Sequence, residues 1–116
     1  MKESFNFSKY YHKFESPDGE FTTVRGEGAS KEYSIGQEVK IKVNRILIGM
    51  AIIGNIERLK IADIPIETLQ RDAKHKGSNV VGRQDFINLL NGFRRFNFIS
   101  SELQFVTLFS LKWRRT

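Results

Sequence analysis

Residues 105–113 read FVTLFSLKW, and this stretch decides the fold. One set of alternate positions holds Phe105, Thr107, Phe109, Leu111 and Trp113, and the other holds Val106, Leu108, Ser110 and Lys112. A period of two is typical of a β-strand. In the segments just before this stretch, apolar residues recur with the period of a helix. The terminal strand must therefore return to a sheet formed by earlier residues. Strands, two helices and a returning strand predict an α+β fold with a mostly closed or strongly curved sheet.

The two segments before this strand are predicted to be helices. The first covers residues 65–76, because Pro65 suits a first helical turn and Gly77 suits a helix end. The second covers residues 82–96. Its apolar side chains follow the spacing of one helical stripe and are Phe86, Leu89, Leu90, Phe93 and Phe96.

The first half of the chain is predicted to supply the other strands. Extended runs cover residues 21–25, 39–43 and 49–59, and residues 5–14 suit a short strand or helical turn. Asn44-Arg45 is read as a tight turn and Gly54 as a bulge. The consecutive apolar residues Ala51-Ile52-Ile53 predict a strand that is buried on both faces.

Composition favours one basic domain over residues 1–116. The chain has 40% hydrophobic and 28% charged residues and a formal net charge of +6, which would attract polyanions such as nucleic acid. It has no cysteine and two histidines without a partner at metal-ligand spacing, so we expect no metal site and no cofactor. No signal-peptide pattern or membrane-length apolar run is evident, and we expect a cytoplasmic protein with no membrane contact. The nucleophile elbow, the Walker loop and the dinucleotide fingerprint are absent from the sequence.

Several short segments together resemble a known family. The run Phe21 to Arg25, a polar loop and the run Tyr33 to Val39 are similar to the opening of the ASCH domain, a branch of the PUA-like β-barrels. The similarity continues through residues 49–53 and 56–59, the helix start at 63–67 and the terminal strand at 106–109. It spans about residues 19–113.

The resemblance implies a small PUA-like β-barrel of about five to six strands, with two helices inserted before the C-terminal strand. It also implies a cleft between barrel and helices that receives nucleic acid or a modified base. Relatives of this kind include RNA-binding modules and small amidohydrolases that deacetylate N4-acetylcytidine-type nucleosides, using a lysine, a threonine nucleophile and a glutamate. Thr23 falls on the threonine of the motif and Arg25 on its arginine. Glu20 stands where the lysine is expected, and Asp72 is the one carboxylate near the expected glutamate.

These departures favour a noncatalytic module that binds RNA or a modified nucleotide, with DNA as a further possibility. Arg25 and Thr23 would contact a phosphate or a base edge, and Tyr33 would stack on a base. Phosphate charge would be met by Lys31, Lys40, Lys42 and Lys76. The alternatives are an amidohydrolase with Thr23 as nucleophile, an adaptor for another protein, or purely structural roles in which Arg25 pairs with Glu27 or Glu38 and Tyr33 belongs to the core.

Overall fold

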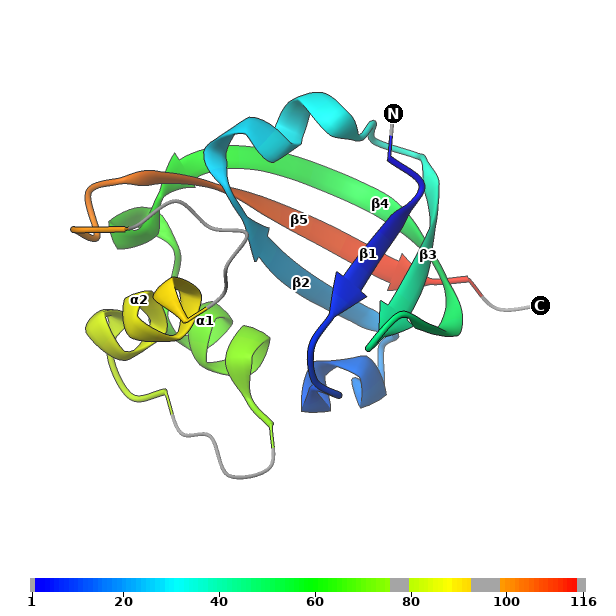
Figure 1. Cartoon of the computed structure of the whole chain (residues 1–116), viewed down its shortest axis with the longest axis horizontal. Helices are drawn as coiled ribbons and strands as arrows, with labels where there is room; N and C mark the ends of the chain where they lie inside the picture. Colours follow the sequence, from blue (N-terminus) through cyan, green and yellow to red (C-terminus); the bar gives the residue numbers. More distant parts are fainter. Residues whose placement is uncertain (1, 76–79, 93–98, 115–116) are drawn as a thin grey trace.

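The computed structural model of the chain describes residues 2–75, 80–92 and 99–114. Its elements, in chain order, are β1 (Ser4–Phe7), η1 (His12–Glu15), β2 (Glu20–Arg25), η2 (Glu27–Glu32), β3 (Glu38–Val43), β4 (Ile46–Lys60), η3 (Ile61–Asp63), α1 (Ile66–Ala73), α2 (Arg83–Asn91) and β5 (Phe105–Trp113). The predicted α+β class and the returning terminal strand are confirmed (Figure 1).

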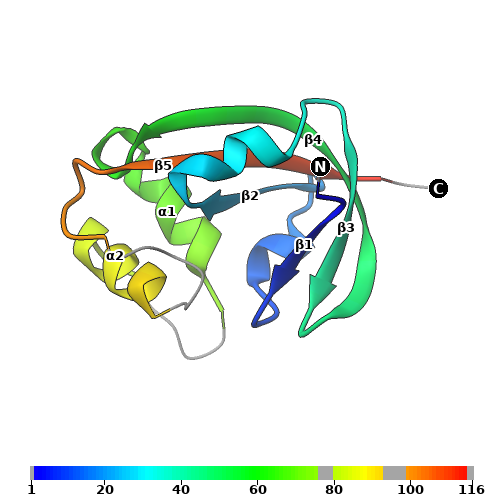
Figure 2. The ribbon, with the colours of Figure 1, turned by 45° about the horizontal axis from the view of Figure 1, so that its top comes forward.

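The strands form one five-stranded sheet that curves into a half-barrel. Their order is β1-β3-β4-β5-β2, with β1 parallel to β3 and the other pairs antiparallel. The last strand, β5, lies between β4 and β2, so it connects β2 to the other strands of the sheet. Helices α1 and α2 lie together at one end of the sheet, away from the hairpin of β3 and β4 (Figures 1 and 2).

A tight turn sets the register of the β3–β4 hairpin. Val43 pairs with Ile46, and the two residues between them, Asn44 and Arg45, have φ angles of 49° and 68°. Positive φ at both central positions is the backbone geometry of a two-residue hairpin turn whose twist matches that of the strands. The turn predicted at Asn44-Arg45 is therefore confirmed.

Strand β4 differs from its prediction in length and burial. It covers 15 residues, from Ile46 to Lys60, and its register with β5 shifts between Ile53 and Asn55, so the predicted bulge at Gly54 is confirmed. Ala51 and Ile53 are fully buried, whereas Ile52 is 40% exposed. The prediction of burial on both faces is wrong because this part of the sheet is covered on its concave side only.

Two apolar clusters pack against opposite faces of the sheet. The concave face carries an aromatic cluster that includes Phe5, Phe7, Tyr33 and Phe109. The other face of β2 and β5 packs Val24, Val106 and Leu108 against α1 and α2. Side chains alternate along each strand, so neighbouring residues of β2 belong to different clusters.

Both helices are shorter than predicted within the described residues. Helix α1 ends at Ala73 because Lys74 is extended and its carbonyl oxygen accepts the backbone N–H of His12 at 2.9 Å. Helix α2 runs from Arg83 to Asn91 with Gly92 as its C-cap. The rest of the two predicted helices, residue 76 of the first and residues 93–96 of the second, lies outside the described residues. No helix of the described chain is long and apolar enough to cross a membrane.

The start of α2 is held by a carboxylate whose pKa is shifted. Asp85 Oδ2 accepts the backbone N–H of Gly82 at 2.9 Å and that of Val81 at 3.1 Å, and these bonds hold the Asp85 pKa below 3.8. A lowered folded-state pKa stabilises the fold above the unfolded pKa, and the stabilisation is lost as pH falls through the folded value.

We therefore predict that Asp85→Ala lowers Tm by about 2–4 °C at about pH 6. The difference from the parent protein should close as the pH falls through the lowered pKa of the folded Asp85, because the parent carboxylate then becomes protonated. Thermal unfolding followed by circular dichroism over a pH series measures the Tm difference and its dependence on pH. If the Tm difference between the parent and Asp85→Ala grew as the pH fell, the stabilising role of the Asp85 carboxylate would be contradicted.

Candidate functional site

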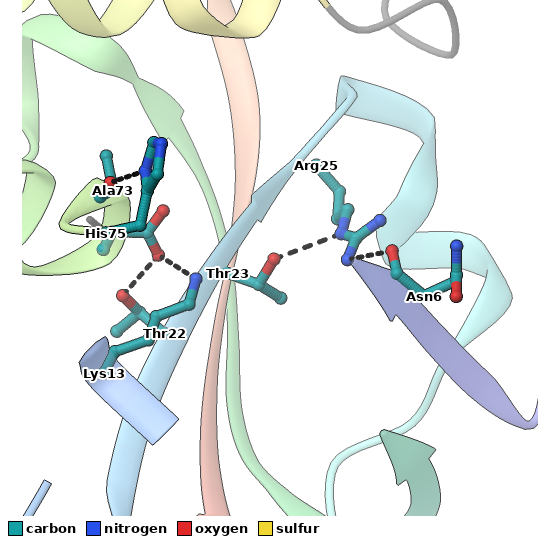
Figure 3. Close-up of polar contacts among 8 residues, drawn as sticks. Asn6, Lys13, Thr22, Thr23, Arg25, Ala73 and His75 are labelled. Atoms are coloured by element: carbon teal, nitrogen blue, oxygen red, sulfur yellow. Dashed lines mark hydrogen bonds and ion pairs between the residues drawn. The ribbon is translucent and has the colours of Figure 1, made fainter. Parts of the chain in front are cut away.

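Arg25 bridges the two edge strands of the half-barrel. It stands at the end of β2, and its Nη2 donates to the backbone carbonyl of Asn6 in β1 at 3.3 Å, while its Nε donates to Thr23 Oγ1 at 3.1 Å (Figure 3). The guanidinium also lies over the rings of Phe5 and Phe7, at 5.1 and 4.9 Å from their centroids. Arg25 is only 9% exposed. Arg25 therefore uses much of its hydrogen-bonding capacity to connect β1 and β2, which are not paired with each other by backbone hydrogen bonds.

This role makes the shape of the guanidinium important. We predict that Arg25→Lys lowers the free energy of unfolding by about 1.5–3 kcal/mol, because an ammonium is not planar and cannot donate to both the Asn6 and the Thr23 oxygens from its place over the two rings. Urea unfolding measures the loss. A change of the same size in Lys31→Arg, at an exposed site on η2, would show that the assay does not report barrel closure.

A concave hollow of about 650 Å³ adjoins Arg25, between η2 and the first residues of β5. We call it the Arg25 hollow. Its lining cations are Lys2, Arg25, Lys31 and Arg58. Two of them are paired: Lys2 with Glu32 at 2.8 Å, and Arg58 with Glu27. The bond to Glu32, with the charge of that carboxylate, raises the pKa of Lys2 above 10.5.

The predicted binding residues divide between several places. Arg25, Lys31 and Tyr33 line the Arg25 hollow, and Thr23 contacts Arg25. Lys40 and Lys42 lie on the other face of the sheet, beside Met50 and Leu47 of β4. Lys76 lies outside the described residues.

Tyr33 has protein partners for both its ring and its hydroxyl. The ring stacks on Phe5 with centroids 4.3 Å apart, and the hydroxyl donates to the Ser4 carbonyl at 2.8 Å. Glu27 and Glu38, the two acids considered for Arg25, bond to Arg58 and Arg114 respectively. The core role considered for Tyr33 therefore agrees with its position.

A second group of polar side chains meets on the opposite side of β2. Thr22 Oγ1 donates to Asp72 Oδ1 at 2.7 Å, and Lys13 Nζ lies 3.2 Å from the same oxygen. The side chains of Lys13 and Asp72 are 5% and 9% exposed. We call these three residues the Thr22 cluster. It brings together a hydroxyl, a carboxylate and an ammonium from three separate elements.

Because successive side chains of a strand point to opposite faces, Thr22 and Thr23 lie on different sides of β2. Thr22 faces α1, whose last turn carries Asp72, and Thr23 faces the barrel interior, as Figure 3 shows on the two sides of β2. Lys13 comes from η1, and its ammonium lies 5.0 Å from the ring centroids of both Phe7 and Tyr11. These rings hold the ammonium toward the carboxylate while keeping water from its stem.

The Thr22 cluster borders an open cavity of about 360 Å³. Its wall includes Thr68 and Ser110, together with the strand residues Phe21 and Leu111, whose side chains pack in the aromatic cluster on the concave face. Charged groups of both signs stand around it, namely Asp18, Glu20, Arg71 and Lys112. The Asp18 carboxylate accepts the backbone N–H of Glu20 and the hydroxyl of Ser16, and these bonds lower its pKa below 3.8. A small polar molecule bound here would contact the Thr22 cluster directly.

The arrangement has the parts that covalent catalysis by threonine requires. A threonine hydroxyl attacks only when a base accepts its proton, and Asp72 already accepts the hydrogen bond of Thr22. An ammonium close by can stabilise a negative charge that develops on the substrate. Thr23 lines a much smaller cavity of about 30 Å³ together with Lys13 and Asp72, but its hydroxyl oxygen accepts a bond from Arg25 and the residue is 3% exposed.

Sequence reasoning identified part of this cluster. It selected Asp72 as the carboxylate near the end of the first helix, chose the neighbouring threonine, and did not select Lys13. One signal was available: Lys13 stands among Tyr10, Tyr11 and Phe14, an unusual setting for an exposed lysine. Within the described residues, no three histidine or acidic side chains gather as metal ligands.

Comparison with known proteins gives one relative. No protein-family model matches the chain, and no solved structure matches it. The chain is 39% identical over 90 residues to Uncharacterized protein MJ0364 of Methanocaldococcus jannaschii, and the match covers 76% of each chain. This chain therefore belongs to the same protein family as MJ0364.

Proposed function

We propose that the chain is a small amidohydrolase of the PUA-like, ASCH-related kind that removes an acyl group from a modified nucleoside of the N4-acetylcytidine type. One observation carries the proposal: Thr22, Asp72 and Lys13 meet at the wall of an open cavity. They are a threonine, a carboxylate and a lysine, the same three kinds of side chain that the resemblance implies. Here the lysine comes from η1 and the threonine is Thr22 rather than Thr23.

The reaction proceeds through an acylated threonine. Thr22 Oγ1 attacks the amide carbonyl carbon and passes its proton to Asp72, while Lys13 supplies positive charge for the oxyanion. The C–N bond then breaks, and the leaving amine takes the proton from Asp72. Water attacks the ester carbon as Asp72 accepts the water proton. Release of the acid returns the proton to Thr22 Oγ1.

The cavity supports a nucleoside-sized substrate. Its volume of about 360 Å³ is near the lower end of the range for small-molecule sites. Thr68 and Ser110 offer hydroxyl contacts to the edges of a base or to a sugar. We further propose that this chemistry takes place in the cytoplasm, where modified nucleosides arise from RNA turnover.

The direct test is incubation of the purified chain with N4-acetylcytidine, with cytidine and acetate followed by chromatography. We expect stoichiometric release of both products. A peptide that carries acetyl-lysine is the matched amide control and should not be cleaved. Absence of turnover of acetylcytidine, its nucleotide and the acetylated base alike would overturn the proposal.

A second candidate function is binding of RNA, and the Arg25 hollow favours it. The hollow is wide, it is lined by four cations, and the chain as a whole carries a net charge of +6. Lys31 on η2 is the lining cation best suited to test this function, because it lies at the surface and its loss leaves barrel closure intact.

Titration of labelled single-stranded RNA over a salt series tests this second function. Neutralising two to four phosphates should give a slope of about −1.4 to −2.8 in log affinity against log salt. We predict that Lys31→Gln reduces the steepness by about 0.7, whereas Lys74→Gln does not. A DNA strand of the same sequence distinguishes the two nucleic acids. A slope near zero would remove the Arg25 hollow as a phosphate site.

A further inference from the structure

The outer face of the β3–β4 hairpin carries an apolar stripe. Along β4 it consists of Leu47, Met50 and Ile52. Leu47 is 54% exposed and Ile52 is 40% exposed. Figure 2 shows β1 and η1 on one side of this hairpin and no described helix on the other. Large aliphatic side chains that are exposed side by side mark a surface for a partner more often than scattered ones do.

Cations border the stripe on both sides. On β3, Lys40 lies opposite Met50 and Lys42 lies opposite Leu47. On β5, Lys112 lies opposite Ile52, and the backbone N–H of Arg114 bonds to the Met50 carbonyl at 2.9 Å. Residues that pair directly across strands point to the same face, so two basic rows enclose one apolar row. The rows on β3 and β5 are separated by about 10 Å.

The face already holds one carboxylate. Glu38 on β3 pairs with Arg114 beyond β4 at 2.7 Å, so this ion pair crosses the stripe. Glu20 of β2 lies opposite Lys112 at the margin. Lys40 and Lys42 are two adjacent ammonium groups in the basic row on β3. They are two residues apart, about 7 Å, which is also the distance between alternate side chains of an extended peptide.

Charge and chemistry together point to one kind of occupant. A second copy of this chain would bring another +6 charge against the basic rows. Single-stranded RNA binds on stacking platforms of aromatic rings, and the described side chains of the stripe are aliphatic.

We infer that this face docks an acidic, amphipathic segment of a partner protein. Its apolar side chains would cover Leu47, Met50 and Ile52, and its carboxylates would meet Lys40 and Lys42. The inference is independent of the proposed hydrolase chemistry, because the β3 row takes no part in the cavity beside the Thr22 cluster.

The experiment uses the full chain and a labelled peptide in which leucine alternates with glutamate. Fluorescence anisotropy should show saturable binding, and Lys40→Glu combined with Lys42→Glu should weaken it at least about tenfold. Leu47→Ser combined with Ile52→Ser should weaken it about fivefold or more. Lys74→Glu is the matched charge control outside the face and should leave the affinity within about twofold.

Two further probes decide between partner classes. A glutamate peptide without leucine should bind at least about tenfold more weakly than the alternating peptide, because it cannot cover the stripe. Polyuridine and vesicles of phosphatidylglycerol should not compete with the peptide. The inference is overturned if the alternating peptide does not bind, if Lys40→Glu with Lys42→Glu binds it as the parent does, or if either competitor displaces it.

Discussion

Replacing Thr22 with valine is expected to lower kcat for acetylcytidine at least about a thousandfold. Valine keeps the shape of threonine but removes the oxygen that donates to Asp72 at 2.7 Å, so neither the nucleophile nor its bond to the base remains. The fold should persist, since Thr22 lies in a paired strand and its backbone bonds to β5 are unchanged. Chromatographic assay of cytidine release, with circular dichroism as the check on folding, measures the effect.

Two variants make this result specific. Thr22→Ser keeps a hydroxyl at the same place and should retain activity within about tenfold. Thr23→Val removes the neighbouring hydroxyl, which accepts a bond from Arg25 on the other side of β2, and should reduce stability more than kcat. If Thr23→Val and Thr22→Val reverse these roles, the threonine expected from the sequence motif is the nucleophile after all. If neither changes the rate, the Thr22 cluster is structural.

The sequence predicted the secondary-structure elements better than it predicted how these elements pack against one another. Alternation along β5, the turn at Asn44-Arg45 and the bulge at Gly54 are local signals, and the structure contains all three. The exposure of Ile52 is not local. It depends on which part of the sheet the helices cover, and α1 and α2 pack over the β2 and β5 end.

The candidate site was harder to predict for the same reason. Alternation implies that Thr22 and Thr23 face opposite ways, but only the position of α1 decides which of them meets Asp72. Lys13 and Asp72 are 59 residues apart, and their contact follows from the docking of η1 against the end of α1. Arg25 was predicted as a ligand-binding cation, while its contacts with Asn6, Phe5 and Phe7 depend on the parallel pairing of β1 with β3, which no local pattern predicts.

Asp72→Asn is expected to lower the free energy of unfolding by about 3–5 kcal/mol. The substitution leaves the Lys13 ammonium inside the protein, with 5% of its side chain exposed, and without the opposite charge that offsets its desolvation. Urea unfolding followed by tryptophan fluorescence measures the loss, since Trp113 contacts Phe14 of η1 and should report the release of that turn. A loss under about 1 kcal/mol would mean that water reaches the pair and that the carboxylate is not the anchor of Lys13.

The double variant Lys13→Met with Asp72→Leu separates the two roles of the cluster. Removing both charges removes the desolvation cost as well, and methionine can still pack against Phe7 and Tyr11, so stability should return to within about 2 kcal/mol of the parent. Activity should not return, because Thr22 then has no base. A stable double variant that still hydrolyses acetylcytidine would show that the reaction occurs elsewhere. A double variant that is as unstable as Asp72→Asn would show that the three elements are held together by the ion pair itself, and not by the aromatic rings that surround it.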